Sequence, residues 1–148
     1  MNKPLLVLDT NAVLDLLHFD DAGARPLRQA LEDGRVRCVV SDATLDEWRR
    51  VLRYPAFSLD AARQAALFER YRSLSSPGSP HAPAPSCSRL PRCRDADDQK
   101  FIELAAAARA HVLVSKDRAV LRLRRRCAPC FRIMTPAETV GWLGALPA

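Results

Sequence analysis

The stretch Pro4–Asn11, which reads PLLVLDTN, decides the fold that we predict for this chain of 148 residues. Its apolar first half is typical of a buried strand, and Asp9 ends that strand sharply. A helix is expected directly afterwards, over residues 12–17. Three later apolar runs predict further short strands: Val36–Val40, Val112–Val114 and Phe131–Met134.

The stretches between these strands carry helical patterns. Leu45, Trp48 and Leu52 repeat at helical spacing and predict a helix over residues 44–52. Further helices are expected over residues 61–74, 96–110 and 118–125, and from Thr135 onward. Residues 73–92 are rich in proline and serine and predict a flexible loop. Short strands that alternate with helices indicate an α/β fold with a parallel sheet buried on both faces, here as one domain over residues 1–148.

The composition is that of a globular protein, with 48% apolar and 27% charged residues. No apolar run approaches the roughly 18 residues of a membrane span. The apolar stretch before Asp9 is too short for a secretion signal, so we expect a cytoplasmic protein. The net charge of +6 fits a phosphate-bearing partner, but it also fits an ordinary soluble surface.

Five cysteines in a chain with a normal core predict reduced thiols. Cys127 and Cys130 form a CxxC motif, and together with Cys87 and Cys93 they could hold a zinc ion. One CxxC without a second closely spaced pair is weak support for such a site.

Acidic residues follow three of the predicted strands. Asp9 comes directly after the first strand, Asp42 closely follows the second, and Asp117 closely follows the third. Because the carboxyl ends of parallel strands share one edge of a sheet, ligands bind at that edge. The sequence therefore predicts an acidic ligand site there.

Two helical acids join these strand-end acids. Asp98 lies in line with the apolar stripe that includes Phe101 and Ile102, and a carboxylate directed at a core is costly unless it is paired, protonated or metal-bound. Glu47 lies near the buried edge of its helix, although a capping box with Thr44 would also explain its position.

Four acids are therefore expected to converge: Asp9, Glu47, Asp98 and Asp117. Their mutual repulsion would raise their pKa values, and a divalent cation would relieve it. Oxygen ligands without a histidine cluster favour Mg²⁺ or Mn²⁺ over Zn²⁺. Such a site can activate water for attack on a phosphodiester. The alternative is that these acids are helix caps and surface charges.

Four stretches of the chain resemble the PIN domain family: Leu5–Leu17 (LLVLDTNAVLDLL), the helix that carries Glu47, Cys93–Ala105 (CRDADDQKFIELA) and Val112–Leu121 (VLVSKDRAVL). They resemble the branch of toxin components of toxin–antitoxin systems. The resemblance implies a three-layer α/β/α fold with a mostly parallel sheet of four to five strands. It further implies an endoribonuclease that uses Mg²⁺ or Mn²⁺, an RNA substrate, a small antitoxin partner and a homodimer.

The resemblance also implies roles for individual residues. The catalytic acids of the family correspond to Asp9, Glu47, Asp98 and Asp117, of which Asp9, Asp98 and Asp117 would be metal ligands. Supporting positions correspond to Thr10, Asn11, Asp95 and Ser115. Lys116 departs from the glycine that is common in this branch. Its long side chain could contact RNA phosphate or crowd the pocket.

Basic residues after Asp117 are candidate RNA contacts. Arg122, Arg124 and Arg125, together with Lys116, could neutralise RNA phosphates, although cations at a solvated helix end have the same pattern. Aromatic residues make up only 6% of the chain and mostly occupy core-like positions. We therefore expect the protein to bind the backbone or the shape of RNA rather than splayed bases.

Two other functions stay open at this point. The segment Asp9–Val13 resembles the nucleophile loop of haloacid dehalogenase-like phosphatases, although Asn11 stands where that chemistry usually needs a second acid. The other alternative is a non-catalytic RNA- or partner-binding domain with the same fold, for which Lys116 leaves room.

Overall fold

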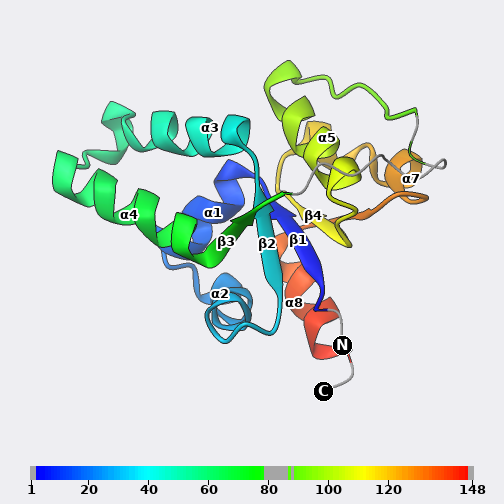
Figure 1. The fold of residues 1–148 in the computed structure, drawn as a ribbon, viewed down its shortest axis with the longest axis horizontal. Helices are drawn as coiled ribbons and strands as arrows, with labels where there is room; N and C mark the ends of the chain where they lie inside the picture. Colours follow the sequence, from blue (N-terminus) through cyan, green and yellow to red (C-terminus); the bar gives the residue numbers. More distant parts are fainter. Residues whose placement is uncertain (1–2, 79–86, 88, 147–148) are drawn as a thin grey trace.

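A five-stranded parallel sheet forms the centre of the molecule (Figure 1). The computed structural model describes residues 3–78, 87 and 89–146. The strand order is β3-β2-β1-β4-β5, and every neighbouring pair is parallel. The strands are short: β1 Leu5–Leu8, β2 Arg37–Val40, β3 Ser75–Pro77, β4 Val112–Val114 and β5 Arg132–Met134. The strand with the apolar run that ends at Asp9 is therefore the central strand.

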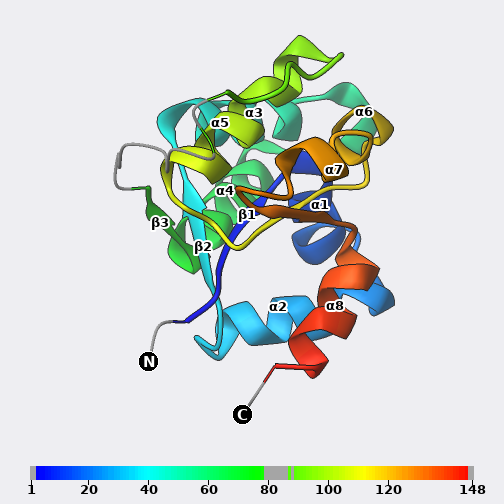
Figure 2. The same ribbon diagram turned by 90° about the vertical axis from the view of Figure 1, so that its right-hand side faces the viewer.

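Helices cover both faces of the sheet (Figures 1 and 2). One face carries α1 Thr10–Leu17, α2 Arg25–Glu32, α3 Asp42–Leu52, α4 Ala61–Leu74 and α8 Pro136–Gly144. The other face carries α5 Gln99–Ala107, α6 Arg118–Leu121 and α7 Arg124–Cys127. Leu6 and Leu8 point into the first core and Val7 points into the second, as alternation along a strand requires. The predicted three-layer α/β fold is confirmed.

The predicted loop over residues 73–92 is wrong at its start. Helix α4 continues to Leu74, and Ser75–Pro77 forms the edge strand β3, in register with Cys38 to Val40 of β2. The ladder continues one residue further, where the Gly78 N–H donates to the Val40 carbonyl at 2.9 Å. Proline is tolerated there because the outer side of an edge strand needs no donor. Residues 79–86 and 88 of the predicted loop lie outside the described residues.

Two predicted helices are divided in the structure. The segment predicted as a helix over residues 96–110 begins with a 3-10 turn, Ala96–Asp98, before α5. The segment predicted over residues 118–125 is divided into α6 and α7. Helix α2 has no counterpart in the sequence prediction, although Pro26 stands in its first turn, where proline is favoured. No helix in the described part of the chain has the length and apolar character to cross a membrane.

A disulfide bond joins Cys87, which precedes α5, to Cys130, which follows α7. The expectation of reduced thiols is therefore wrong for this pair and holds for the buried residues Cys38, Cys93 and Cys127. Cys87 is buried in the core beneath α5 and the half-buried Cys130 packs against that core, so the bond joins two chain segments 43 residues apart. A zinc site formed by four thiolates is excluded in this state, because two of the thiols are consumed.

Replacement of Cys130 by serine should lower the free energy of unfolding by roughly 2–4 kcal/mol, because the unfolded chain regains the entropy of an open loop. Urea denaturation measures the loss. A reductant should destabilise the wild type to a similar degree and leave Cys130→Ser unchanged. Equal stability of the oxidised wild type and the variant would contradict the structural role of this bond.

Candidate active site at the carboxyl edge of the sheet

Asp9 lies at the end of the central strand, where the chain turns into α1. As the N-cap of α1, it accepts a hydrogen bond from the Ala12 N–H at 2.9 Å through Oδ1. Its residue exposure is only 3%. Its carboxylate is therefore fixed at the edge of the sheet by the strand on one side and the helix on the other.

Ser115 connects two of the strand-end acids. Its hydroxyl donates a short hydrogen bond to Asp9 Oδ2 and accepts one from the Asp117 N–H at 3.0 Å. Asp117 in turn caps α6 through the Ala119 N–H at 2.8 Å. Ser115 is fully buried, so this hydroxyl holds β1 and the turn after β4 in a fixed relation.

The start of α5 brings two further acids to the same edge. Asp95 caps the 3-10 turn through the Asp97 N–H at 3.0 Å, and Asp98 is the last residue of that turn. The buried Gln99 anchors the preceding segment: its side chain accepts from the Cys93 N–H at 2.7 Å and donates to the Pro91 carbonyl at 3.2 Å. This anchor holds the segment that carries Asp95 next to the sheet.

Three carboxylates meet closely at this edge. One oxygen each from Asp95, Asp98 and Asp117 lies within 4.8 Å of the others. Asp98 Oδ2 is buried and has no hydrogen-bond partner among the described residues. A buried carboxylate oxygen without a donor is costly, and a cation in contact with it removes that cost. The donor set, all carboxylate oxygen, fits Mg²⁺ or Mn²⁺.

The electrostatics of the site agree with this geometry. Burial raises the pKa of Asp98 to about 8, assisted by the adjacent carboxyl group of Asp117 and by the charges of Asp95 and Asp9. Burial also raises the pKa of Asp9 to about 6, against the opposing hydrogen bonds from Ser115 and Ala12. Without a metal, Asp9 and Asp98 therefore keep their protons to a higher pH than ordinary carboxyl groups do. A bound cation would displace these protons.

Glu47 lies on the α3 side of the site. Its Oε2 accepts a short hydrogen bond from the Thr10 hydroxyl, and its Oε1 lies 2.7 Å from Lys100 Nζ and 3.8 Å from an Arg50 nitrogen. The alternative that Glu47 is occupied in a capping box with Thr44 is wrong, because Ser41 is the N-cap and pairs with Thr44. Glu47 is thus directed at the site, with its charge compensated by two cations.

All four predicted acids line one hollow of about 250 Å³. Its wall also contains three of the residues predicted as supporting positions: Thr10, Asn11 and Asp95. Ser115 lies behind this wall, in contact with Asp9. The wall further contains residues that sequence reasoning did not assign to the site: Leu14, Val51, Tyr54, Phe57 and Asp97. Helical or strand spacing does not indicate Tyr54 and Phe57, because the turn between α3 and α4 brings them to the site.

A sequence model of the PIN domain matches residues 5–119 of the chain. The chain belongs to the PIN domain family. The match begins at β1 and ends within α6, so it spans Asp9, Glu47, Asp98 and Asp117. PIN domains are generally nucleases and typically bind divalent metal ions. The comparison with curated proteins returns no match to the chain.

The basic residues considered as RNA contacts do not line the acidic hollow of this PIN domain. Lys116 Nζ lies 2.6 Å from Asp15 Oδ2 and lines a neighbouring hollow, so it does not crowd the site. Arg124 is paired with Glu138. Arg122 and Arg125 are exposed on the surface next to α6 and α7. Their contact with RNA stays a prediction.

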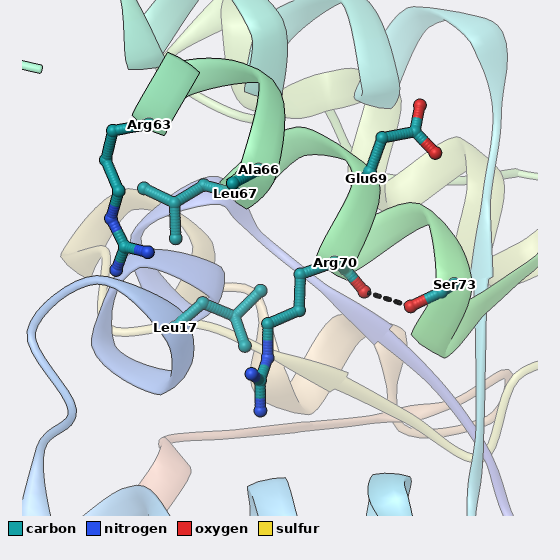
Figure 3. Close-up of a pocket in the computed structure, with 7 residues that line it drawn as sticks. All are labelled: Leu17, Arg63, Ala66, Leu67, Glu69, Arg70 and Ser73. Carbon is teal, nitrogen blue, oxygen red and sulfur yellow. Dashed lines mark hydrogen bonds between the residues drawn. The ribbon is translucent and has the colours of Figure 1, made fainter. Parts of the chain in front are cut away.

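A second hollow of the PIN domain lies between α1 and α4 (Figure 3). Arg63 and Arg70 lie on either side of Leu17 there. Arg70 is already paired with Glu32 at 2.6 Å. This hollow therefore lacks the concentration of carboxylates that distinguishes the site at the sheet edge.

Ser115→Ala should lower the catalytic activity of this PIN domain by roughly 10- to 100-fold, the usual cost of losing a residue that orients a metal ligand. The change removes the donor to Asp9 and the acceptor for the Asp117 N–H. The cleavage rate at saturating Mn²⁺ measures the effect. Ser73→Ala is the matched control, since its hydroxyl donates to the Arg70 carbonyl on the exposed side of α4, and Ser73 does not line the acidic hollow. Wild-type activity in Ser115→Ala would contradict the positioning role.

Proposed function

We propose that this PIN domain is an endoribonuclease that hydrolyses RNA phosphodiester bonds with Mg²⁺ or Mn²⁺. The observation that carries the proposal is the meeting of Asp95, Asp98 and Asp117 around a buried oxygen that has no described hydrogen-bond partner. If Asp98 had only a structural role, its buried oxygen would lack a compensating partner. As a metal ligand, the same oxygen would bind the cation. Family membership supports nuclease chemistry at this edge.

Six residues of the hollow have a part in the proposed reaction. Asp95, Asp98 and Asp117 would hold the cation, and Asp9 would complete or orient that shell from the floor of the site. When bound, the cation supplies charge neutralisation at the phosphate and acidifies water. Asn11, exposed at the hollow, would orient the substrate, and Glu47 with Lys100 would order the opposite wall. Hydrolysis in this manner leaves a 5′-phosphate and a 3′-hydroxyl.

The experiment is cleavage of end-labelled RNA by the purified chain with Mg²⁺ or Mn²⁺, compared with the same reaction in EDTA. We expect cleavage only with the cation, and we expect the downstream fragment to be a substrate for a 5′-phosphate-dependent exonuclease. Cleavage that persists in EDTA, or fragments with 2′,3′-cyclic phosphate ends, would contradict the proposal.

The sequence resemblance supports a second part of the proposal, that the nuclease is the toxin of a type II toxin–antitoxin system. It would act in the cytoplasm as a homodimer, and a small antitoxin would cover the acidic hollow. Induced expression in a bacterial host should stop growth, and Asp98→Asn should abolish this effect. Normal growth during expression of active nuclease would contradict the toxin role.

The two alternative functions have less support. Membership of the PIN domain family argues against a haloacid dehalogenase-like phosphatase. Lys116 left room for the non-catalytic alternative, but its side chain is paired with Asp15 and does not crowd the site. The non-catalytic alternative also leaves the close meeting of the three carboxylates unexplained.

A further inference from the structure

Two lysines stand next to the proposed metal ligands in the sequence. Lys116 directly precedes Asp117, and Lys100 follows Asp98 by two residues. An ammonium group on a flexible side chain is attracted to the carboxylate cluster that these acids form with Asp95, where it competes with a divalent cation for the same oxygens. The cluster is therefore open to a metal ion only while both ammonium groups are held elsewhere.

Both ammonium groups are in fact held by acids outside the carboxylate cluster. Lys116 Nζ lies 2.6 Å from Asp15 Oδ2 on α1. Lys100 Nζ lies 2.7 Å from Glu47 Oε1 on α3. Asp98 Oδ2 agrees with this arrangement, because it has no hydrogen-bond partner among the described residues. Neither lysine thus donates to the oxygen that a bound cation would contact.

Asp15 is a buried acid within α1. Its side chain is 12% exposed, whereas that of Lys116 is 51% exposed. A nearly buried carboxylate without a counter-charge is costly, and a short ion pair with an ammonium group offsets this cost. The two residues line a hollow of about 390 Å³ between α1 and the start of α8, separate from the acidic hollow. The burial of Asp15 therefore favours a direction of the Lys116 side chain that leads away from the cluster.

The backbone on either side of Lys116 is fixed. The Ser115 hydroxyl is bonded to Asp9, and Asp117 caps α6 through the Ala119 N–H at 2.8 Å. The loop therefore cannot carry Lys116 away from the cluster as a whole. The direction of its side chain decides whether the ammonium group meets Asp15 or the metal ligands.

We propose that Asp15 is a positioning residue of the metal site: it holds the Lys116 ammonium group away from the carboxylate cluster and so leaves the cluster open to a divalent cation. Loss of the Asp15 charge would release Lys116, which would then pair with the cluster as an internal competitor of the metal ion. This inference rests on the proposed function, in which the cluster binds Mg²⁺ or Mn²⁺.

The test is the affinity of the purified full chain for Mn²⁺, measured by isothermal titration calorimetry at pH 8. Asp15→Asn should weaken Mn²⁺ binding by about tenfold, because the released Lys116 competes for the carboxylates. Lys116→Met in the Asp15→Asn background should restore the wild-type affinity, since the competitor is then gone. Asp15→Glu, which keeps the negative charge, should bind Mn²⁺ nearly as tightly as the wild type.

Asp21→Asn is the matched control, because Asp21 lines the same hollow as Asp15, whereas the ion pair of Lys116 is with Asp15. It should bind Mn²⁺ as the wild type does. Thermal unfolding in EDTA checks that each variant is folded before the titration. Asp15→Ser, with and without Lys116→Met, gives the same comparison if Asp15→Asn does not fold.

The outcomes separate this inference from the proposed function. Equal Mn²⁺ affinity of Asp15→Asn and the wild type would overturn the inference and leave the metal site in place. A loss of affinity that Lys116→Met does not restore would also overturn it, because Asp15 would then act through the packing of α1. Absence of Mn²⁺ binding by the wild type would refute the proposed function and, with it, this inference.

Discussion

Asp98→Asn should reduce RNA cleavage by roughly 10³-fold, because loss of a metal ligand removes several kcal/mol of charge stabilisation from the transition state. Asp98 carries the buried oxygen that has no described donor, and its carboxylate lies beside Asp95 and Asp117. The amide keeps the size of the side chain and resembles the protonated acid. The measurement is the initial cleavage rate at several Mn²⁺ concentrations.

The variant should nevertheless remain folded. Its thermal midpoint without metal at pH 8 should equal or exceed that of the wild type, because one repelling carboxylate is gone. Glu103→Gln is the matched control, an exposed acid on the same helix α5, and it should cleave RNA normally. A fully active Asp98→Asn would refute the assignment of the metal site.

The stability of the metal-free protein should fall as the pH rises from about 4 to about 8. The pKa values of Asp9 and Asp98 are raised in the fold from 3.8 to about 6 and about 8. A carboxyl group with a raised folded-state pKa contributes stability that is complete below its unfolded pKa and is lost as the pH passes its folded pKa. For the deeply buried Asp9, this loss corresponds to roughly 3 kcal/mol.

Urea denaturation between pH 5 and pH 8.5 measures this dependence. Exposed acids whose pKa is lowered, such as Asp20 beside Arg25, contribute in the opposite direction, so the informative quantity is the difference between wild type and Asp98→Asn. That difference should grow in favour of the variant as the pH rises. Mn²⁺ should stabilise the wild type much more at pH 8 than at pH 5, because protons compete for the ligands. If the stabilities of the wild type and Asp98→Asn changed in parallel with pH, this result would contradict the raised pKa of Asp98.

The elements that could be predicted from the sequence are those whose signal is local. The strand before Asp9 is apolar and ends abruptly, so its place in a parallel sheet follows from its own residues. Ser75–Pro77 has none of the β-branched or aromatic residues typical of strands, and it is a strand only because β2 offers hydrogen bonds along its edge. A strand that depends on its partner cannot be found from its own composition.

The same distinction applies to the site. Asp9, Asp98 and Asp117 could be chosen from strand ends and helical spacing, and the structure brings them to one hollow. The direction of Lys116 could not be predicted, because it depends on Asp15 in another element. The place of Tyr54 in the wall of the hollow could not be predicted either, since the turn between α3 and α4 determines it.

The hydrogen bond from Ser115 to Asp9 spans 106 residues, and this separation has a consequence for protein synthesis. Asp9 leaves the ribosome early, but β4 and the turn that carries Asp117 follow much later. A nascent chain therefore lacks the hydrogen bond between Ser115 and Asp9 until β4 has been synthesised. The order of the strands therefore delays assembly of the acidic hollow until the turn that carries Asp117 has been made.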